Sequence, residues 1–210
     1  ILPEDEEVNT DHFIYTNDNG KNWQISAGTR AHRGSTWEAT IWEPINGEIW
    51  MIARNIGTEE KVQKTPMTEA AGYNYSLDFG KTWMHEKRNV LPMELSNSRP
   101  HVLNYGKRNI MAHNDYYTPS INHWEHRYNI ALFFNRGPGV NFVAGPTIDN
   151  RMSEYPQMYI HKNQMVVIYS ARKHYPATAP TQSKELNDRF IMAARLKLPE
   201  PDKYYIFART

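Results

Sequence analysis

The stretch Ser76-Leu-Asp-Phe-Gly-Lys-Thr-Trp83 decides the fold, because its pattern recurs in the chain. Thr16-Asn-Asp-Asn-Gly-Lys-Asn-Trp23, earlier in the chain, has the same order of residue types, Ser/Thr-x-Asp-x-Gly-x-Thr/Asn-Trp. A weaker third copy, Asn135-Arg-Gly-Pro-Gly-Val-Asn-Phe142, follows the second at almost the same interval and keeps a glycine, a polar residue and an aromatic residue. A fixed period of about 60 residues indicates one structural unit repeated along the chain.

Each copy has the chemistry of a tight turn between two antiparallel strands. We expect Asp78 to accept hydrogen bonds from backbone N–H groups two residues further on. Gly80 supplies a position with φ > 0, which other residues resist. Trp83 is expected to begin the next strand and to bury its indole under the turn. The preceding residues, Gly72-Tyr-Asn-Tyr75, are rich in strand formers, which favours a hairpin.

The repeated motif resembles the Asp-box, or bacterial neuraminidase repeat, of sialidase-type β-propellers. The resemblance implies an all-β fold, a propeller with six blades when complete, of which this chain holds about three to four. The expected blades are 11–28 (the end of one), 30–90, 95–148 and 153–210, with almost no helix. We expect the chain to be the C-terminal part of a longer protein, or a partial chain. In this family the boxes lie on the outer rim, so they indicate fold rather than activity.

The amino-acid composition excludes several classes of binding partner and of site. The chain has 24 basic and 23 acidic residues, with no polybasic run, so neither nucleic acid nor an anionic membrane is indicated as a partner. No apolar run approaches the ~18 residues of a membrane span. There is no cysteine, which excludes disulfides and thiolate metal sites. No cofactor is predicted, the histidines lack the spacing of a metal site, and the oligomeric state stays open.

Two segments are similar to the sialidase segments that carry catalytic groups. Trp37-Glu38-Ala-Thr-Ile-Trp-Glu43, followed by Met51-Ile-Ala-Arg54, implies that Glu38 is the base and Arg54 is a clamp arginine. Arg127 begins a predicted strand and matches a second clamp arginine. Tyr155 follows Arg127 at the interval that the family alignment requires, and it matches the nucleophile of the family.

The chemistry implied by this resemblance is electrostatic. A carboxylate nucleophile would be repelled by an anionic substrate, so the family uses a neutral tyrosine, an exception to the usual pair of carboxylates. A base activates the tyrosine, and arginines grip the carboxylate of the sugar. The chain departs from the family at Pro156, where serine often stands. No residue of the chain matches the first clamp arginine or the aspartate general acid of the family.

The resemblance therefore predicts a secreted or periplasmic exo-glycoside hydrolase that removes a terminal anionic sugar, sialic acid by default, from glycans. A second hypothesis is a polysaccharide lyase on the same fold. His113 and Asn114 end a predicted strand that runs into a long loop, where binding groups gather. A histidine beside a tyrosine can transfer protons in β-elimination of a uronic acid. A third hypothesis is a carbohydrate-binding propeller without activity.

Overall fold

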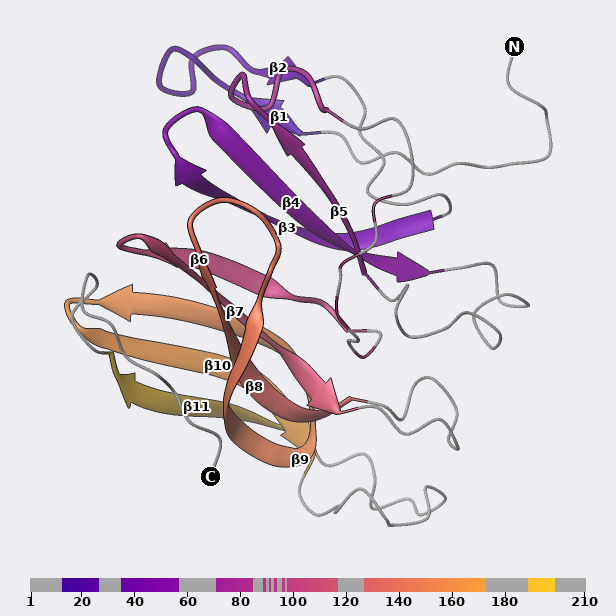
Figure 1. The fold of residues 1–210 in the computed structure, drawn as a ribbon, viewed down its shortest axis with the longest axis vertical. Helices are drawn as coiled ribbons and strands as arrows, with labels where there is room; N and C mark the ends of the chain where they lie inside the picture. Colours follow the sequence, from indigo (N-terminus) through magenta and orange to yellow (C-terminus); the bar gives the residue numbers. More distant parts are fainter. Residues whose placement is uncertain are drawn as a thin grey trace.

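The computed structural model describes residues 13–26, 35–56, 71–84, 89, 91, 93, 96, 98–116, 127–172 and 189–198. These residues form strands and turns only, with no helix among them (Figure 1). The strands are β1 (Ile14–Tyr15), β2 (Gln24–Ile25), β3 (Ser35–Ile45), β4 (Glu48–Ile56), β5 (Ala71–Ser76), β6 (His101–Tyr105), β7 (Arg108–Tyr116), β8 (Tyr128–Arg136), β9 (Val143–His161), β10 (Gln164–Arg172) and β11 (Arg189–Lys197).

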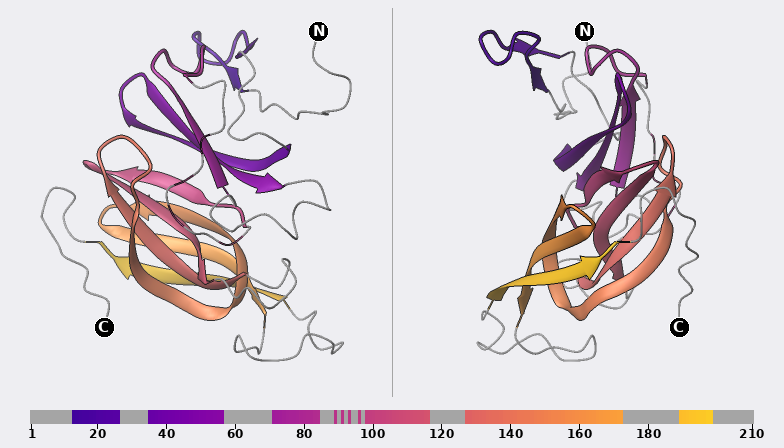
Figure 2. Two further views of the ribbon diagram at one scale, coloured as in Figure 1. Left: turned by 45° about the vertical axis from the view of Figure 1, so that its right-hand side comes forward. Right: turned by 90° about the vertical axis from the view of Figure 1, so that its left-hand side faces the viewer.

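The strands make three antiparallel sheets that follow one another in chain order. The first contains β1 and β2, the second β3, β4 and β5, and the third runs from β6 to β11 with each strand beside its neighbour in sequence. The views in Figures 1 and 2 show these units stacked face to face along the molecule. Up-and-down pairing of this kind needs only short turns, and Gly47 and Gly106 lie in two of them with positive φ.

Strand β7 shows why the stack is stable. Side chains alternate between the two faces of a strand, so residues one apart reach different cores. Met111 packs into the cluster shared with Trp42 and Trp50 of the second sheet, whereas Ile110 and Ala112 pack into the cluster on the other side, shared with β10 and β11. The part of the six-stranded sheet that β7 and β8 form is therefore apolar on both faces, and burial of these side chains holds the units together.

The two best copies of the repeat form nearly the same turn. Ser76 Oγ accepts a hydrogen bond from the backbone N–H of Gly80 (2.8 Å), and Asp78 Oδ1 accepts one from the N–H of Thr82 (2.8 Å). Thr16 and Asp18 make the equivalent bonds in the first copy. The aspartate therefore reaches four residues ahead, rather than two as predicted, because residue 79 already adopts a positive φ of 60° and tightens the turn.

The aromatic residue of the repeat is buried to different extents. Trp83 lies against Phe13, with ring centroids 4.9 Å apart, and is partly buried. Trp23 is 60% exposed, so the predicted burial of the indole holds only in part. Trp83 and Met84 lie outside any strand, while the rest of the predicted strand 83–87 and the strand at 204–208 fall outside the described residues.

Strand β9 is longer than any strand that the sequence predicts. Its 19 residues pair with β8 over the first half and with β10 over the second. The predicted blades 95–148 and 153–210 thus meet inside one continuous strand. Three irregularities in the β8–β9 register lie in the first half and bend the strand from one unit into the next.

Candidate functional site

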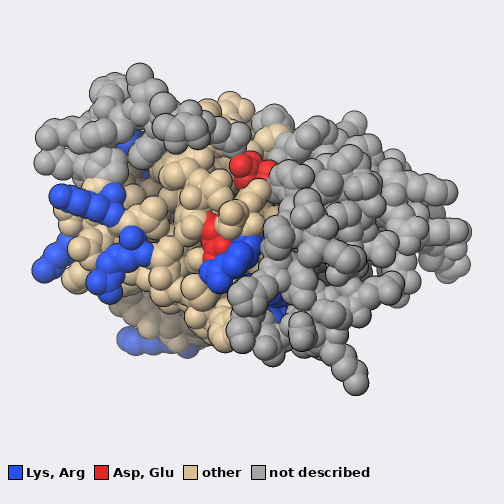
Figure 3. All heavy atoms as spheres, turned by 90° about the horizontal axis from the view of Figure 1, so that it is seen from below, with Lys and Arg blue, Asp and Glu red and all other residues tan. Residues whose placement is uncertain are grey.

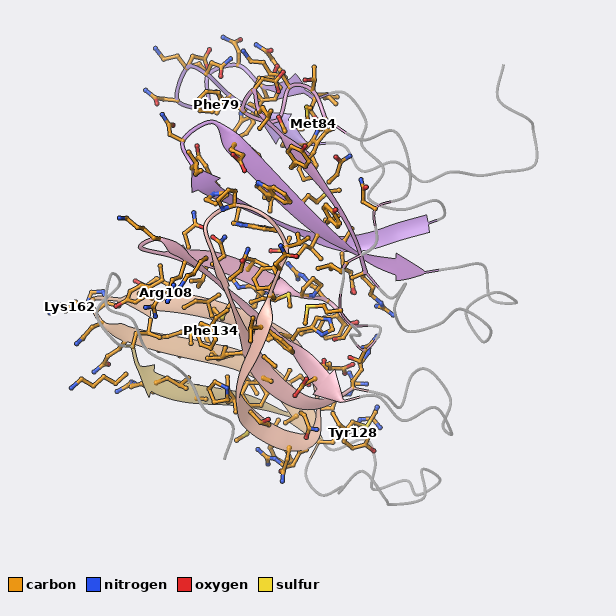
Figure 4. All side chains as sticks on the ribbon, in the orientation of Figure 1. Phe79, Met84, Arg108, Tyr128, Phe134 and Lys162 are labelled. Carbon is orange, nitrogen blue, oxygen red and sulfur yellow. The ribbon has the colours of Figure 1, made fainter. Side chains whose placement is uncertain are left out.

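All of the residues that the sequence singles out for chemistry lie at one end of the sheets. Tyr128, which follows Arg127, marks this end in Figure 4, and the turns that carry Arg108 and Lys162 lie at the opposite end. The register agrees, because the end of β7 pairs with the start of β8 and the end of β10 with the start of β11. Side chains from several strands can therefore gather here.

Glu38 lies in a bulge near the start of β3. Trp37 pairs with Arg54 and Thr40 pairs with Ile52, so two residues of β3 face one residue of β4. Glu38 has a φ of 49°, a left-handed conformation that is rare for residues other than glycine. The bulge turns its carboxylate toward β4, where Arg54 Nη1 donates a hydrogen bond to Glu38 Oε2 at 2.8 Å. Arg54 is buried and Glu38 is partly exposed.

Tyr155 lies in an equivalent bulge of β9. Glu154 pairs with Ser170 and Gln157 with Ile168, so Tyr155 and Pro156 face a single residue of β10. Tyr155 has a φ of 57°, again left-handed. Strained positions of this kind cost on the order of 1–3 kcal/mol and concentrate at functional sites. The sequence did not predict either bulge, although each lies in the strand that opens its unit.

Arg127 joins Tyr155 to a carboxylate. Its guanidinium lies over the Tyr155 ring, 5.3 Å from the centroid, and its Nη1 donates a short hydrogen bond to Glu154 Oε2. Arg127 and Glu154 are both buried, whereas Tyr155 is partly exposed to solvent. The arrangement presents a phenol at the surface with a buried cation against its ring, and the same cation is paired with Glu154.

Asn114 connects the two strands that carry these groups. Its side-chain Nδ2 donates to the backbone carbonyls of Tyr128 (3.1 Å) and Ser153 (2.8 Å). The backbone N–H of Ser153 also donates to the carbonyl of Arg127 at 2.7 Å. Through these bonds Asn114 holds the start of β8 against β9. Because Asn114 is fully buried, it lies away from the surface that a ligand would reach.

His113 is also fully buried, between the two arginine positions. Its Nδ1 lies 2.9 Å from the carbonyl oxygen of Asn114 and its Nε2 lies 2.9 Å from that of Ser98. Burial lowers the pKa of His113, the positive charges of Arg127 and Arg54 lower it further, and the two carbonyl contacts act in the opposite direction. A neutral imidazole donates to only one of the two carbonyls. Neither nitrogen is directed at a site where a substrate proton could be exchanged.

The structure therefore groups the predicted residues into two pairs, Glu38 with Arg54 and Arg127 with Tyr155. His113 lies close enough to both arginines to feel their charges. Within the described ranges no hydrogen bond joins Glu38 to Tyr155, and the hydrogen bond that the Glu38 carboxylate accepts comes from Arg54. The same ranges contain no group of three His, Asp or Glu side chains arranged to hold a metal ion.

Two residues of this site were missed in the sequence. Glu154 directly precedes Tyr155, and Arg189 begins β11, with its Nη1 2.5 Å from Glu154 Oε1. The local pattern did not single out Glu154, because the same segment also carries Asp149, Asn150 and Arg151. The partner could not be named, because Arg189 comes from a different strand, well beyond the next turn in the sequence.

Comparison with known proteins tests the fold. No protein-family model and no curated protein matches the sequence. Among solved structures, a protein of unknown function from Dyadobacter fermentans matches with a TM-score of 0.61 at 18% identity, over 90% of this chain and 46% of its own. Trypanosoma rangeli sialidase matches with a TM-score of 0.58 at 11% identity, over 88% and 26%. The K499G mutant of NanB sialidase from Streptococcus pneumoniae gives 0.54 at 16%, over 75% and 23%.

These likenesses concern the fold alone, and the chain spans less than half of each of these structures. No helix in the described part of the chain is both long enough and apolar enough to cross a membrane. The stacked antiparallel sheets, the repeated turn and the solved structures agree: the chain has the all-β fold of a sialidase-type β-propeller and holds about three to four of its blades.

Proposed function

We propose that this protein is a glycoside hydrolase that removes a terminal carboxylated sugar, sialic acid by default, from glycans outside the cytoplasm. One observation carries the proposal: Tyr155, held in a strained bulge and open to solvent, lies over the guanidinium of Arg127. The interval between these two residues in the chain is the one that the sialidase resemblance requires. A cation beside a phenol favours the charged form of a tyrosine nucleophile.

In the proposed reaction the Tyr155 oxygen attacks the anomeric carbon and the bond to the leaving oxygen breaks. Glu38 takes the phenolic proton, and water then hydrolyses the tyrosyl–sugar bond. The leaving oxygen takes its proton from a general acid, for which no residue of the chain matches the family. Arg54 and Arg127 attract the sugar carboxylate. Because Glu38 is bonded to Arg54, the ligand carboxylate has to displace it, which frees Glu38 to act as the base.

His113 and Asn114 support this site rather than contact the substrate. Asn114 holds the backbone at Tyr128, after Arg127, and at Ser153, two residues before Tyr155, and His113 is buried with its ring nitrogens at the carbonyls of Asn114 and Ser98. The burial of His113 gives no support to its use as the proton-transfer group of a lyase. A propeller that binds a glycan without cleaving it is the outcome if the test below finds binding and no turnover.

The test uses 2,3-difluorosialic acid, which a structure of Trypanosoma rangeli sialidase holds as a covalent intermediate. The protein is incubated with this compound, digested and analysed by mass spectrometry, and hydrolysis of a fluorogenic aryl sialoside is measured in parallel. We expect an adduct on the peptide that contains Tyr155, and loss of both the adduct and turnover in Tyr155→Phe. Tyr159→Phe is the matched control, because Tyr159 lies on the same strand and is 62% exposed. Full activity of Tyr155→Phe rules out the nucleophile role.

A further inference from the structure

One carboxylate, directly before Tyr155 in the chain, holds two arginines, and one of them contacts the Tyr155 ring. Arg127 Nη1 donates to Glu154 Oε2, and Arg189 Nη1 lies 2.5 Å from Glu154 Oε1. Each oxygen of the carboxylate therefore serves a different guanidinium. Arg127 comes from the strand before the bulge and Arg189 from the strand at the edge of the sheet, so Glu154 brings cations from two successive units to the same point.

The two arginine side chains differ in how much of each is exposed to solvent and can be reached by a ligand. The side chain of Arg127 is 5% exposed, whereas that of Arg189 is 51% exposed. The guanidinium of Arg127 is occupied by Glu154 on one side and by the ring of Tyr155 on another. An anion that approaches Tyr155 from solvent therefore meets Arg189 more readily than Arg127.

The surroundings of Arg189 add positive charge. Arg172 pairs with it directly across β10 and β11, and like charges opposite each other destabilise a sheet. Within the described ranges Arg172 forms no ion pair, and Glu154 is the carboxylate shared by this group of arginines. In the view from below, most of the Lys and Arg side chains of the described surface lie on the left, at the end of the sheets that carries the turns, so the excess charge beside Arg189 comes from Arg172 and not from the wider surface (Figure 3). Positive charge in excess of the local carboxylate favours an anionic ligand.

We propose that Arg189 is a substrate-binding residue that contacts the anionic group of the ligand beside Tyr155, and that Glu154 positions it there. Its guanidinium keeps donors that Glu154 does not use, and a planar guanidinium suits a carboxylate better than an ammonium does. Arg172 strengthens the local positive potential. The identity of the anion as a sugar carboxylate rests on the proposed function, whereas the position of the binding group rests on the geometry of Glu154 and Arg189.

The experiment compares two probes by titration calorimetry at low salt, free N-acetylneuraminic acid and its methyl ester, which lacks the negative charge. We expect the wild-type protein to prefer the acid, with a preference that falls as NaCl is added. Arg189→Gln should weaken acid binding by about tenfold or more and leave ester binding unchanged. Arg195→Gln is the matched control, since Arg195 is exposed on the same face of the same strand. Arg189→Lys keeps the charge and should lose only part of the preference.

Several results would overturn the inference: no preference for the acid in the wild type, an unchanged preference in Arg189→Gln, or an equal loss for acid and ester, which a purely structural role produces. A thermal melt of each variant checks folding, and Arg189→Lys remains decisive if the glutamine variant is unstable. The assay needs no turnover, so it separates the two proposals. If Tyr155→Phe stays active while Arg189→Gln loses the preference, the nucleophile assignment fails and the role of Arg189 stands.

Discussion

Replacement of Asn114 by leucine should destabilise the protein far more than its position near a strand end suggests. Asn114 is fully buried, and its Nδ2 donates to the carbonyls of Tyr128 and Ser153 at 3.1 and 2.8 Å. Its Oδ1 has no hydrogen-bond partner in the described part of the chain, so leucine loses nothing on that side. Leucine has the same branched skeleton of heavy atoms, so it leaves no cavity, although its methyl groups are bulkier than the amide.

The magnitude follows from the two carbonyl groups that lose a donor in a place that water does not reach. A buried polar group without its partner costs about 1–3 kcal/mol, so two groups at the lower part of that range give a loss of ~2–4 kcal/mol in the free energy of unfolding. This is a large share of the stability of an ordinary domain, which is roughly 5–15 kcal/mol.

Urea unfolding followed by tryptophan fluorescence measures this loss. Asn150→Leu is the matched control, because Asn150 is exposed on β9 and its replacement should change the free energy by no more than about 0.5 kcal/mol. If Asn114→Leu loses less than about 1 kcal/mol while its urea dependence is unchanged, the two hydrogen bonds do not hold β8 to β9 as described.

Two further predictions concern the turns and the packing of the sheet. Gly145→Ala should cost at least about 1–3 kcal/mol, because a Cβ there would clash with the Phe134 ring and would lie 2.9 Å from the backbone carbonyl oxygen of Leu132. Gly80→Ala, whose Cβ meets nothing within 4 Å, should cost only the strain of its φ of 80°, about 1–2 kcal/mol, and equal losses in thermal melts of the two variants would contradict this contrast. Hydrogen bonds from the backbone and side chain of Thr82 and from Ser76 lower the pKa of Asp78 from 3.8 to about 2, so its stabilising contribution is complete above pH 3.8 and is lost as the pH falls through 2. Asp78→Asn should therefore show a smaller fall in unfolding midpoint than the wild type between pH 5 and 2, and an identical fall in both proteins would show that the turn is not pH-linked through this residue.

The turns were the most predictable part of the fold. A box such as Ser76 to Trp83 specifies its own geometry, because its side chains bond to its own backbone within the motif. Strand positions followed from local alternation: the sequence predicts strands at 48–55, 72–76, 108–114 and 165–172, and β4, β5, β7 and β10 begin at or within one residue of these starts. The reach of Asp78 was underestimated because the positive φ of Phe79 depends on the closed turn and not on the preference of phenylalanine.

Residues of the candidate site could be predicted from the sequence, but the contacts between them could not. Spacing singled out Arg127 and Tyr155, and the ring contact between them is consistent with that pairing. The partners of the charges were not predictable, because Glu154 and Arg189 come together only through the register of β9, β10 and β11. The strand predicted to end at His113 and Asn114 continues only as far as Tyr116, but the full burial of both side chains was not predicted.

Strand β9 also determines how the protein unfolds. Its first half completes one unit and its second half begins the next, without a linker between them. Unfolding that starts at either end of the six-stranded sheet has to disrupt the hydrogen bonds of β9 before it can advance. The neighbouring units are therefore coupled and unfold as one cooperative unit rather than two. Protected backbone amides along β9 should consequently report one common free energy of opening, and a destabilising substitution in either unit should lower it along the whole strand.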